Sequence, residues 1–266
     1  GDHRDLHRVD LRQRQMCIRD RVKIISARDL WFQIIQTRME TGEPYIVNID
    51  TCNEALPEEQ KKLGLEIKQS NLCSEITLPT NEERTAVCCL SSVNLEYFDE
   101  WSVNDSFISD LVTMLDNVLE SFITSVKDKD GYSKAAYSAM RERSIGLGAM
   151  GFHSYLQKNN IPFESMYAAS FNNKAFSLIK DRADKATRQL GEERGEAPDM
   201  KGSGKRNAHL LAVAPNASSS IICGATSPSI EPNRANVYTH KTLTGSFKVK
   251  NKPITGDVLS RIQPGS

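Results

Sequence analysis

A long stretch of helical periodicity between Ser106 and Lys127 constrains the fold of this chain more than any other feature. Apolar residues recur there every three or four positions, which is typical of a helix with one buried face. These residues are Ile108, Leu111, Val112, Leu115, Val118, Leu119, Phe122, Ile123 and Val126. We therefore expect one long amphipathic helix over this range.

Shorter signals predict further helices. Ser26 followed by Asp29 fits a helix start in which both residues cap the first turn. Gly42 and Pro44 then end that helix. Another helix is expected over residues 170–190, because Gly191 or Gly195 can close it.

Strands are expected at four places between these helices. They cover residues 45–49, 86–90, 210–214 and 236–239. Residues 145–151 are small and apolar, which favours close packing of the backbone, whereas the composition of residues 196–206 predicts a flexible loop. Strands mixed with long helices predict an α/β architecture.

The composition restricts the class of protein. The 266 residues carry 34 basic and 34 acidic side chains, so no net charge drives binding to nucleic acid or to an anionic membrane. Apolar residues make up 39% of the chain, which supports a packed core, and no apolar run approaches the length of a membrane span. No apolar segment of the kind found in secretory signals follows the basic residues at the start. Six cysteines without a CxxC pair predict reduced thiols in a cytoplasmic protein and no metal site.

The two ends of the chain differ from its middle. The chain has no initiator Met and stops at Ser266 with no closing element, so we expect a piece of a longer protein. Residues 1–21 interleave Arg with Asp and fit neither a helical nor a strand period. We expect a disordered or non-native extension over residues 1–21 and one domain over residues 22–266.

The segment Ser70–Ile76 combines three chemically useful side chains. Asn71, Cys73 and Glu75 stand at alternate positions, and alternate side chains of an extended segment project on the same side. An amide, a thiol and a carboxylate on one side can act together on one bound molecule, with Glu75 as a general base. The alternative is a solvent-exposed strand face on which these residues have no joint role.

A second thiol, Cys88, follows Glu75 by thirteen residues and is adjacent to Cys89. Neighbouring thiols in a strand point to opposite faces, and a disulfide between neighbours is strained. We therefore expect one of the pair to face the same cavity as Cys73 and the other to pack in the core. Core packing is also the default expectation for Cys223.

A third candidate is the segment Pro215–Ile221, which follows an apolar stretch. Three consecutive hydroxyl residues, Ser218, Ser219 and Ser220, come after small residues. A strand, a tight turn and a helix start would present N–H groups and hydroxyls to an anion, which predicts a phosphate site. The alternative is an ordinary serine-rich turn with a helix cap, since neither a Walker A motif nor GxGxxG is present.

Together these motifs closely resemble the large, catalytic subunit of class I ribonucleotide reductase. The resemblance covers roughly residues 22–255. The strongest matches are Asn71–Ile76, Val87–Leu95, Pro215–Ser220 and Ile230–Pro232, and weaker ones are Thr41–Ile46 and Arg143–Gly148. The finger, Asn71–Ile76, together with the downstream Cys88 is specific to the family. The serine loop, Pro215–Ser220, is not specific when it occurs alone.

The resemblance implies a fold and a set of roles. The family fold is a ten-stranded α/β barrel with a central finger loop, of which residues 22–266 would form part. Cys73 would become a transient thiyl radical, Glu75 would act as general base, and Asn71 would bind the substrate. Cys88 would be one of two thiols that end as a disulfide, with its partner upstream and absent from this chain. Substrate phosphates would be bound by Ala217, Ser218 and Ser219.

The resemblance also implies partners. The activity would be reduction of ribonucleoside diphosphates to deoxyribonucleotides for DNA synthesis, with no cofactor bound by this chain. A metal-containing small subunit would supply the radical, and thioredoxin or glutaredoxin would act as reductant. ATP and deoxynucleotide effectors would bind regions missing here, and the full-length chain would form a homodimer. This chain alone would be inactive. The alternatives are a cobalamin-dependent or anaerobic reductase and a non-catalytic nucleotide-binding remnant.

Overall fold

The computed structural model describes residues 24–233, 235, 237–242 and 245–250, and the expected extension over residues 1–21 lies outside them. The chain divides into two compact units, one ending at Ile46 and the other beginning at Val47. Among the described residues, no helix is both long and apolar enough to cross a membrane.

The first unit contains helix α2 (Ala27–Thr41). The Ser26 hydroxyl accepts a hydrogen bond from the Asp29 N–H at 3.4 Å, which satisfies one N–H of the first turn. Gly42 ends the helix in the left-handed conformation, with φ of 82°. The prediction of a helix from Ser26 to Gly42 is therefore confirmed.

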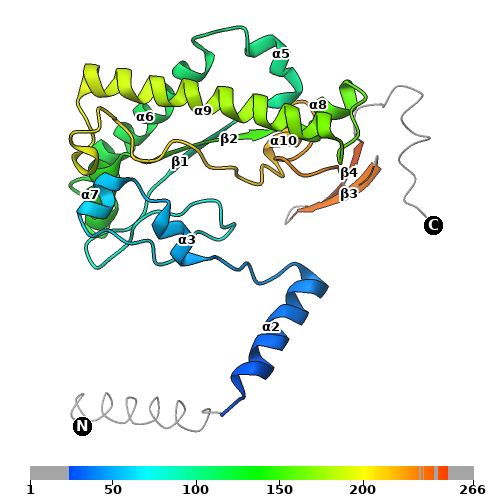
Figure 1. Cartoon of the computed structure of the whole chain (residues 1–266), viewed down its shortest axis with the longest axis horizontal. Helices are drawn as coiled ribbons and strands as arrows, with labels where there is room; N and C mark the ends of the chain where they lie inside the picture. The colour runs from blue at the N-terminus through cyan, green and yellow to red at the C-terminus, as the bar shows by residue number, and fades with distance from the viewer. Residues whose placement is uncertain (1–23, 234, 236, 243–244, 251–266) are drawn as a thin grey trace. The chain divides into compact units, whose positions relative to one another are not determined.

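The second unit holds the remaining described elements (Figure 1). Its α-helices are α3 (Ile49–Glu54), α4 (Glu58–Lys62), α5 (Phe98–Trp101), α6 (Phe107–Val126), α7 (Ser133–Glu142), α8 (Phe152–Lys158), α9 (Met166–Arg194) and α10 (Ser219–Ile222). Two short 3₁₀ helices, η1 (Leu95–Tyr97) and η2 (Pro198–Met200), accompany them. The strands are β1 (Cys89–Asn94), β2 (Ile145–Met150), β3 (Val237–Thr242) and β4 (Gly245–Lys250).

The centre of this unit is a parallel sheet. Strands β1 and β2 pair from Cys89 with Ile145 to Asn94 with Met150. A parallel bridge between Leu147 and Leu211 brings a third segment to the other edge of β2. Parallel neighbours need a crossover connection, which α6 and α7 provide between β1 and β2. The predicted α/β architecture is confirmed.

The long helices bury their apolar faces against this sheet and against each other. Helices α6 and α9 pack together, and Figure 1 shows both running along the same side of β1 and β2. Ile108, Val112 and Leu119 of α6 are fully buried, as the apolar period predicts. The second expected helix is also present, but it starts earlier and ends later than residues 170–190.

Close backbone packing occurs at β2, as its composition predicts. All six residues of β2 are buried. A methyl group on Gly148 would overlap the carbonyl oxygen of Ala212, and one on Gly146 would lie 3.1 Å from the Cys88 sulfur. The two glycines thus allow neighbouring segments to approach β2 closely.

Several predicted strands differ from the structure. No strand forms over residues 45–48, where Asn48 instead starts α3 and its carbonyl accepts from the Cys52 N–H. The strand expected at residues 86–90 begins at Cys89 and runs on to Asn94. Only Leu211 forms a bridge within residues 210–214. The strand expected at residues 236–239 forms from Val237, and residue 236 lies outside the described residues.

Residues 196–206 form a loop, as predicted, but contacts with distant residues fix it, so the predicted flexibility is wrong. This segment contains η2, and Asp199 within it is buried. The Asp199 carboxylate accepts hydrogen bonds from both terminal nitrogens of Arg84, at 2.6 and 3.2 Å, and lies 2.6 Å from Arg141 Nη2. Because two arginines hold this carboxylate, a segment of polar composition is tied to the rest of the unit.

Candidate active site

The finger segment forms a tight turn. The Ser74 N–H donates to the Asn71 carbonyl at 3.1 Å, and the Ile76 N–H donates to the Asn71 side-chain oxygen at 3.1 Å. Ser74 takes the left-handed conformation, with φ of 62°. The predicted extended geometry is therefore wrong, because the Asn71 side chain closes the turn itself and reverses the chain at Cys73.

The three finger residues have different environments in this turn. Cys73 and Asn71 are exposed, whereas Glu75 is half-buried. One Glu75 carboxylate oxygen, Oε2, is shielded from solvent and has no hydrogen-bond partner among the described residues. A shielded carboxylate oxygen without a donor is free to accept a proton from a bound molecule.

A cavity of about 640 Å³ lies between the base of the finger and the start of β1. Its lining includes Ser70 and Asn71 from the finger and Arg84, Thr85 and Cys88 from the returning chain. Cys73 and Glu75 are not among the residues that line it, which differs from the expectation that one of the adjacent thiols shares a cavity with Cys73. The structure thus brings the finger amide and the second thiol to one cavity.

Cys88 and Cys89 have different neighbours. Cys88 lines the cavity, whereas Cys89 packs against the hydrophobic core. Burial, together with the neighbouring Cys89, Glu142 and Glu75, raises the pKa of Cys88 to about 12. Cys88 is therefore a protonated thiol at neutral pH. The described cysteines, including Cys73 and Cys223, are free thiols. Cys223 is exposed, so the expectation that it packs in the core is wrong.

The serine loop is attached to the ends of the parallel strands. The Asn216 amide donates to the Ser92 hydroxyl at 2.9 Å and to the Ala149 carbonyl at 3.2 Å. Ala217, Ser218 and Ser219 after it are exposed. Among the described residues, the N–H groups of these three have no hydrogen-bond acceptor. They do not line the finger cavity, but they lie beside the carboxyl ends of β1 and β2, where barrel enzymes bind ligands.

Sequence reasoning missed two groups close to Cys88. The ion pair between Arg84 and Asp199 joins residues that are 115 positions apart, and Arg84 lines the finger cavity. Glu142 is fully buried at the end of α7. No local pattern marks either group, because only the folded chain brings their partners together.

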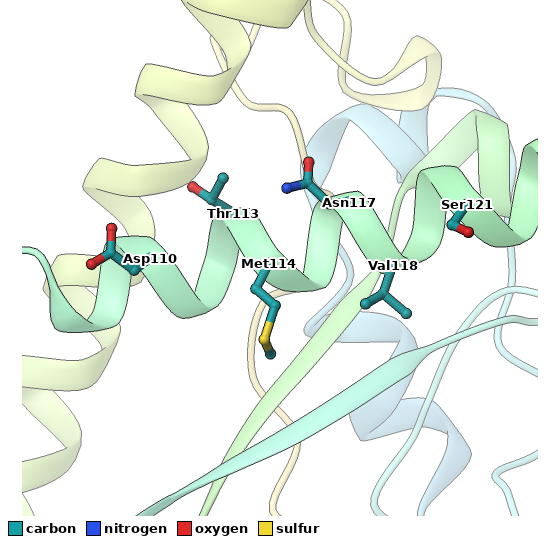
Figure 2. Close-up of a pocket in the computed structure, with 6 residues that line it drawn as sticks. All are labelled: Asp110, Thr113, Met114, Asn117, Val118 and Ser121. Atoms are coloured by element: carbon teal, nitrogen blue, oxygen red, sulfur yellow. The ribbon is translucent and has the colours of Figure 1, made fainter.

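A second pocket lies away from these residues. Its volume is about 420 Å³, and all its lining residues come from α6. Figure 2 shows Met114 and Val118 on one side of the helix and Thr113 and Asn117 on another. None of the expected site residues lines it. Within the described part of the chain, no group of three or more His, Cys, Asp or Glu side chains could hold a metal ion.

Comparison with known families decides the relationship. A sequence profile described as "Ribonucleotide reductase, barrel domain" matches residues 10–204 and 197–262. This chain belongs to that family. The expected fold, part of an α/β barrel of the ribonucleotide reductase type, is therefore confirmed.

Two of the similar proteins are viral. The chain is 55% identical over 238 residues to the ribonucleoside-diphosphate reductase large subunit of Invertebrate iridescent virus 3, covering 90% of this chain and 38% of that protein. It is 52% identical over 237 residues to the putative large subunit of Frog virus 3, covering 89% and 42%.

A solved structure agrees with these relatives. The Actinobacillus ureae class Id ribonucleotide reductase alpha subunit superposes with a TM-score of 0.76 at 42% identity, covering 79% of this chain and 40% of that one. The expected membership among large subunits of class I reductases is confirmed. The chain spans about two fifths of the length of these three relatives.

Proposed function

We propose that this chain carries the catalytic centre of a ribonucleoside-diphosphate reductase, with residues 22–266 as part of its barrel domain. The reaction is reduction of ribonucleoside diphosphates to 2′-deoxyribonucleoside diphosphates by a thiyl-radical mechanism. One observation carries the proposal: the finger amide Asn71 and the thiol Cys88 line the same cavity. The relatives, which are ribonucleoside-diphosphate reductase large subunits, support it.

The finger residues take the first part of the reaction. Cys73, exposed on the turn, abstracts the ribose 3′ hydrogen as a thiyl radical. Glu75 accepts the 3′-hydroxyl proton, for which its shielded Oε2 is available. Asn71 uses its Oδ1 to close the turn, which leaves its amide N–H groups to hold the ribose.

Cys88 takes part in the reduction itself. Loss of the 3′ hydrogen makes departure of the 2′-hydroxyl feasible. The 2′ C–O bond breaks, a C–H bond forms, two thiols become one disulfide, and water leaves. Cys88 is one of these thiols, and the second comes from a region upstream of residues 22–255. A thiol that is protonated at neutral pH suits this step, because the thiol must supply hydrogen.

The serine loop binds the substrate's phosphates in this proposal. Ala217, Ser218 and Ser219 are exposed and offer backbone N–H groups without acceptors among the described residues. Two hydroxyls add further donors. Asn216 fixes the loop to β1 and β2, so its donors are held in place before the substrate arrives.

The remaining partners follow from the same assignment. The radical is supplied by a metal-containing small subunit, and thioredoxin or glutaredoxin restores the thiols. ATP and deoxynucleotide effectors act through other regions of a homodimeric, cytoplasmic enzyme. The class Id alpha-subunit neighbour favours this assignment over a cobalamin-dependent or anaerobic reductase. Identity of 55% to a large subunit favours it over a non-catalytic remnant.

The test separates binding from chemistry. The complete subunit, combined with its small subunit and a dithiol, is expected to convert ribonucleoside diphosphates to deoxyribonucleoside diphosphates. The Cys73→Ser variant is expected to bind the same substrate with unchanged affinity and to form no product. Substrate binding without any conversion by the wild-type complex would support the nucleotide-binding remnant instead.

A further inference from the structure

The start of β2 forms the wall behind Cys88. The parallel pairing joins Cys89 of β1 to Ile145 of β2. Cys88 and Ser144 are the residues that directly precede this pair in the two segments. The Cys88 sulfur lies so close to Gly146 that a methyl group there would be 3.1 Å away. Groups that contact Ser144 therefore lie near the thiol.

Glu142 is held directly behind this wall. Its side chain is fully buried. The Ser138 hydroxyl donates to Oε1 at 2.7 Å, and the Ser144 hydroxyl donates to Oε2 at 3.0 Å. Within the described residues, no cation lies within ion-pair distance of Glu142. A buried carboxyl that is held by two hydroxyls and unpaired with a cation has no evident packing role.

Charged groups approach Glu142 and Cys88 from several elements. Burial raises the pKa of Glu142, and the negative charge of Asp199 raises it further. The hydrogen bonds from the two serine hydroxyls and the positive charge of Arg84 lower it. Arg84 and Arg141 are engaged by Asp199, so neither neutralises Glu142 directly.

Besides burial, three titratable groups raise the pKa of the Cys88 thiol. They are Cys89, Glu142 behind it and Glu75 from the finger. Any negative charge at these positions disfavours ionisation of the Cys88 thiol.

We propose that Glu142 is a positioning residue that, with Ser144, holds Cys88 as a protonated thiol. The inference rests on the proposed function, in which Cys88 must supply hydrogen to the substrate, and it adds a residue outside the finger to that chemistry. Glu142 does not touch the substrate and acts through the wall formed by Ser144 and Gly146.

The test measures how fast the Cys88 thiol reacts in the complete subunit. Iodoacetamide modifies thiolates, so the modification rate of the Cys88 peptide, followed by mass spectrometry from about pH 7 to about pH 10, reports its ionisation. Glu142→Gln preserves shape and hydrogen bonding but removes the charge. The rate at Cys88 is expected to rise about fivefold or more at a given pH.

Controls separate charge from structure. The rate at the exposed Cys223 is expected to stay unchanged in Glu142→Gln. Glu164→Gln removes the same charge from an exposed position and is expected to leave Cys88 at the wild-type rate. Glu142→Asp keeps the charge and is expected to restore slow modification.

A second variant keeps the proposal testable if Glu142→Gln does not fold. Ser144→Ala removes one donor to the carboxylate, which favours the neutral acid and is expected to speed Cys88 modification in the same direction. Identical pH profiles for wild type and either variant would overturn the role of Glu142. Modification needs no turnover, so failure of the proposed function would show separately, as loss of nucleotide reduction by the wild-type complex.

Discussion

At the scale of single residues, the Asn71 side chain and the left-handed Ser74 determine the shape of the finger. The pattern of Asn71, Cys73 and Glu75 is visible in the sequence. The turn is not, because it depends on the Asn71 side chain accepting from the Ile76 N–H and on the left-handed Ser74. Cys88 faces the cavity, whereas Cys89 faces the core. The sequence alone does not show which of these two adjacent thiols faces which side.

Glu75→Gln tests the proposed base. Gln has a similar shape but cannot accept the 3′-hydroxyl proton, so the rate of nucleotide reduction is expected to fall about 10²- to 10⁴-fold. Substrate affinity is expected to change little. The rate is measured with the complete subunit and its small subunit, and Glu83→Gln, at an exposed position before β1, serves as control. A Glu75→Gln variant with wild-type turnover would remove Glu75 from the mechanism.

At the scale of elements, helices are predicted better than strands. The period of α6 is a local property, so both its ends agree with the sequence to within one residue. A strand needs a partner, and residues 45–48 have none within the part of the chain that the structure describes. In contrast, β1 extends to Asn94 because β2 pairs with it throughout. Order in residues 196–206 likewise depends on Arg84, far away in the chain.

Gly148→Ala tests the close packing at β2. The added methyl group would overlap the Ala212 carbonyl, so the backbone must shift and the free energy of unfolding is expected to fall by about 1–3 kcal/mol. Urea unfolding of the variant and of wild type measures the difference. Ser121→Ala, on the exposed face of α6, is expected to change it by less than about 0.5 kcal/mol. Equal stability of Gly148→Ala and wild type would contradict the close approach.

At the scale of the whole molecule, one buried carboxylate joins distant elements. Asp116 on α6 accepts from Arg143 Nε at 2.9 Å, from Arg194 Nη1 at 3.0 Å and from the Asn207 amide at 3.2 Å. Asp116 is fully buried and Arg143 nearly so. Loss of the carboxylate would leave the buried guanidinium without its main partner, which is costly.

Asp116→Asn is therefore expected to lower the free energy of unfolding by about 3 kcal/mol at pH 7. Burial raises the pKa of Asp116, but hydrogen bonds and charge from Arg143 outweigh it and lower the pKa below its usual value. A lowered pKa gives stability that is present above the unfolded-state pKa and lost as pH falls through the folded-state pKa. The difference between variant and wild type is expected to shrink in acid, below about pH 4. Urea unfolding at several pH values checks this, and a constant difference would contradict it.

The resemblance to class I large subunits carries information that local patterns do not. The spacing of Asn71, Cys73 and Glu75 alone does not distinguish a reaction centre from a solvent-exposed strand. Family membership and the shared cavity of Asn71 and Cys88 favour the reaction centre. The roles of Ser218 and Ser219 still rest on the resemblance, because their loop lies outside that cavity.

The most direct test of the radical assignment is the amount of deoxyribonucleoside diphosphate formed per subunit by wild type and by Cys73→Ser, each combined with the small subunit. The expected result is many turnovers for wild type and no product above background for Cys73→Ser. Cys223→Ser, at another exposed thiol, is expected to match wild type. Deoxyribonucleotide formation by Cys73→Ser at a rate near that of wild type would contradict the account.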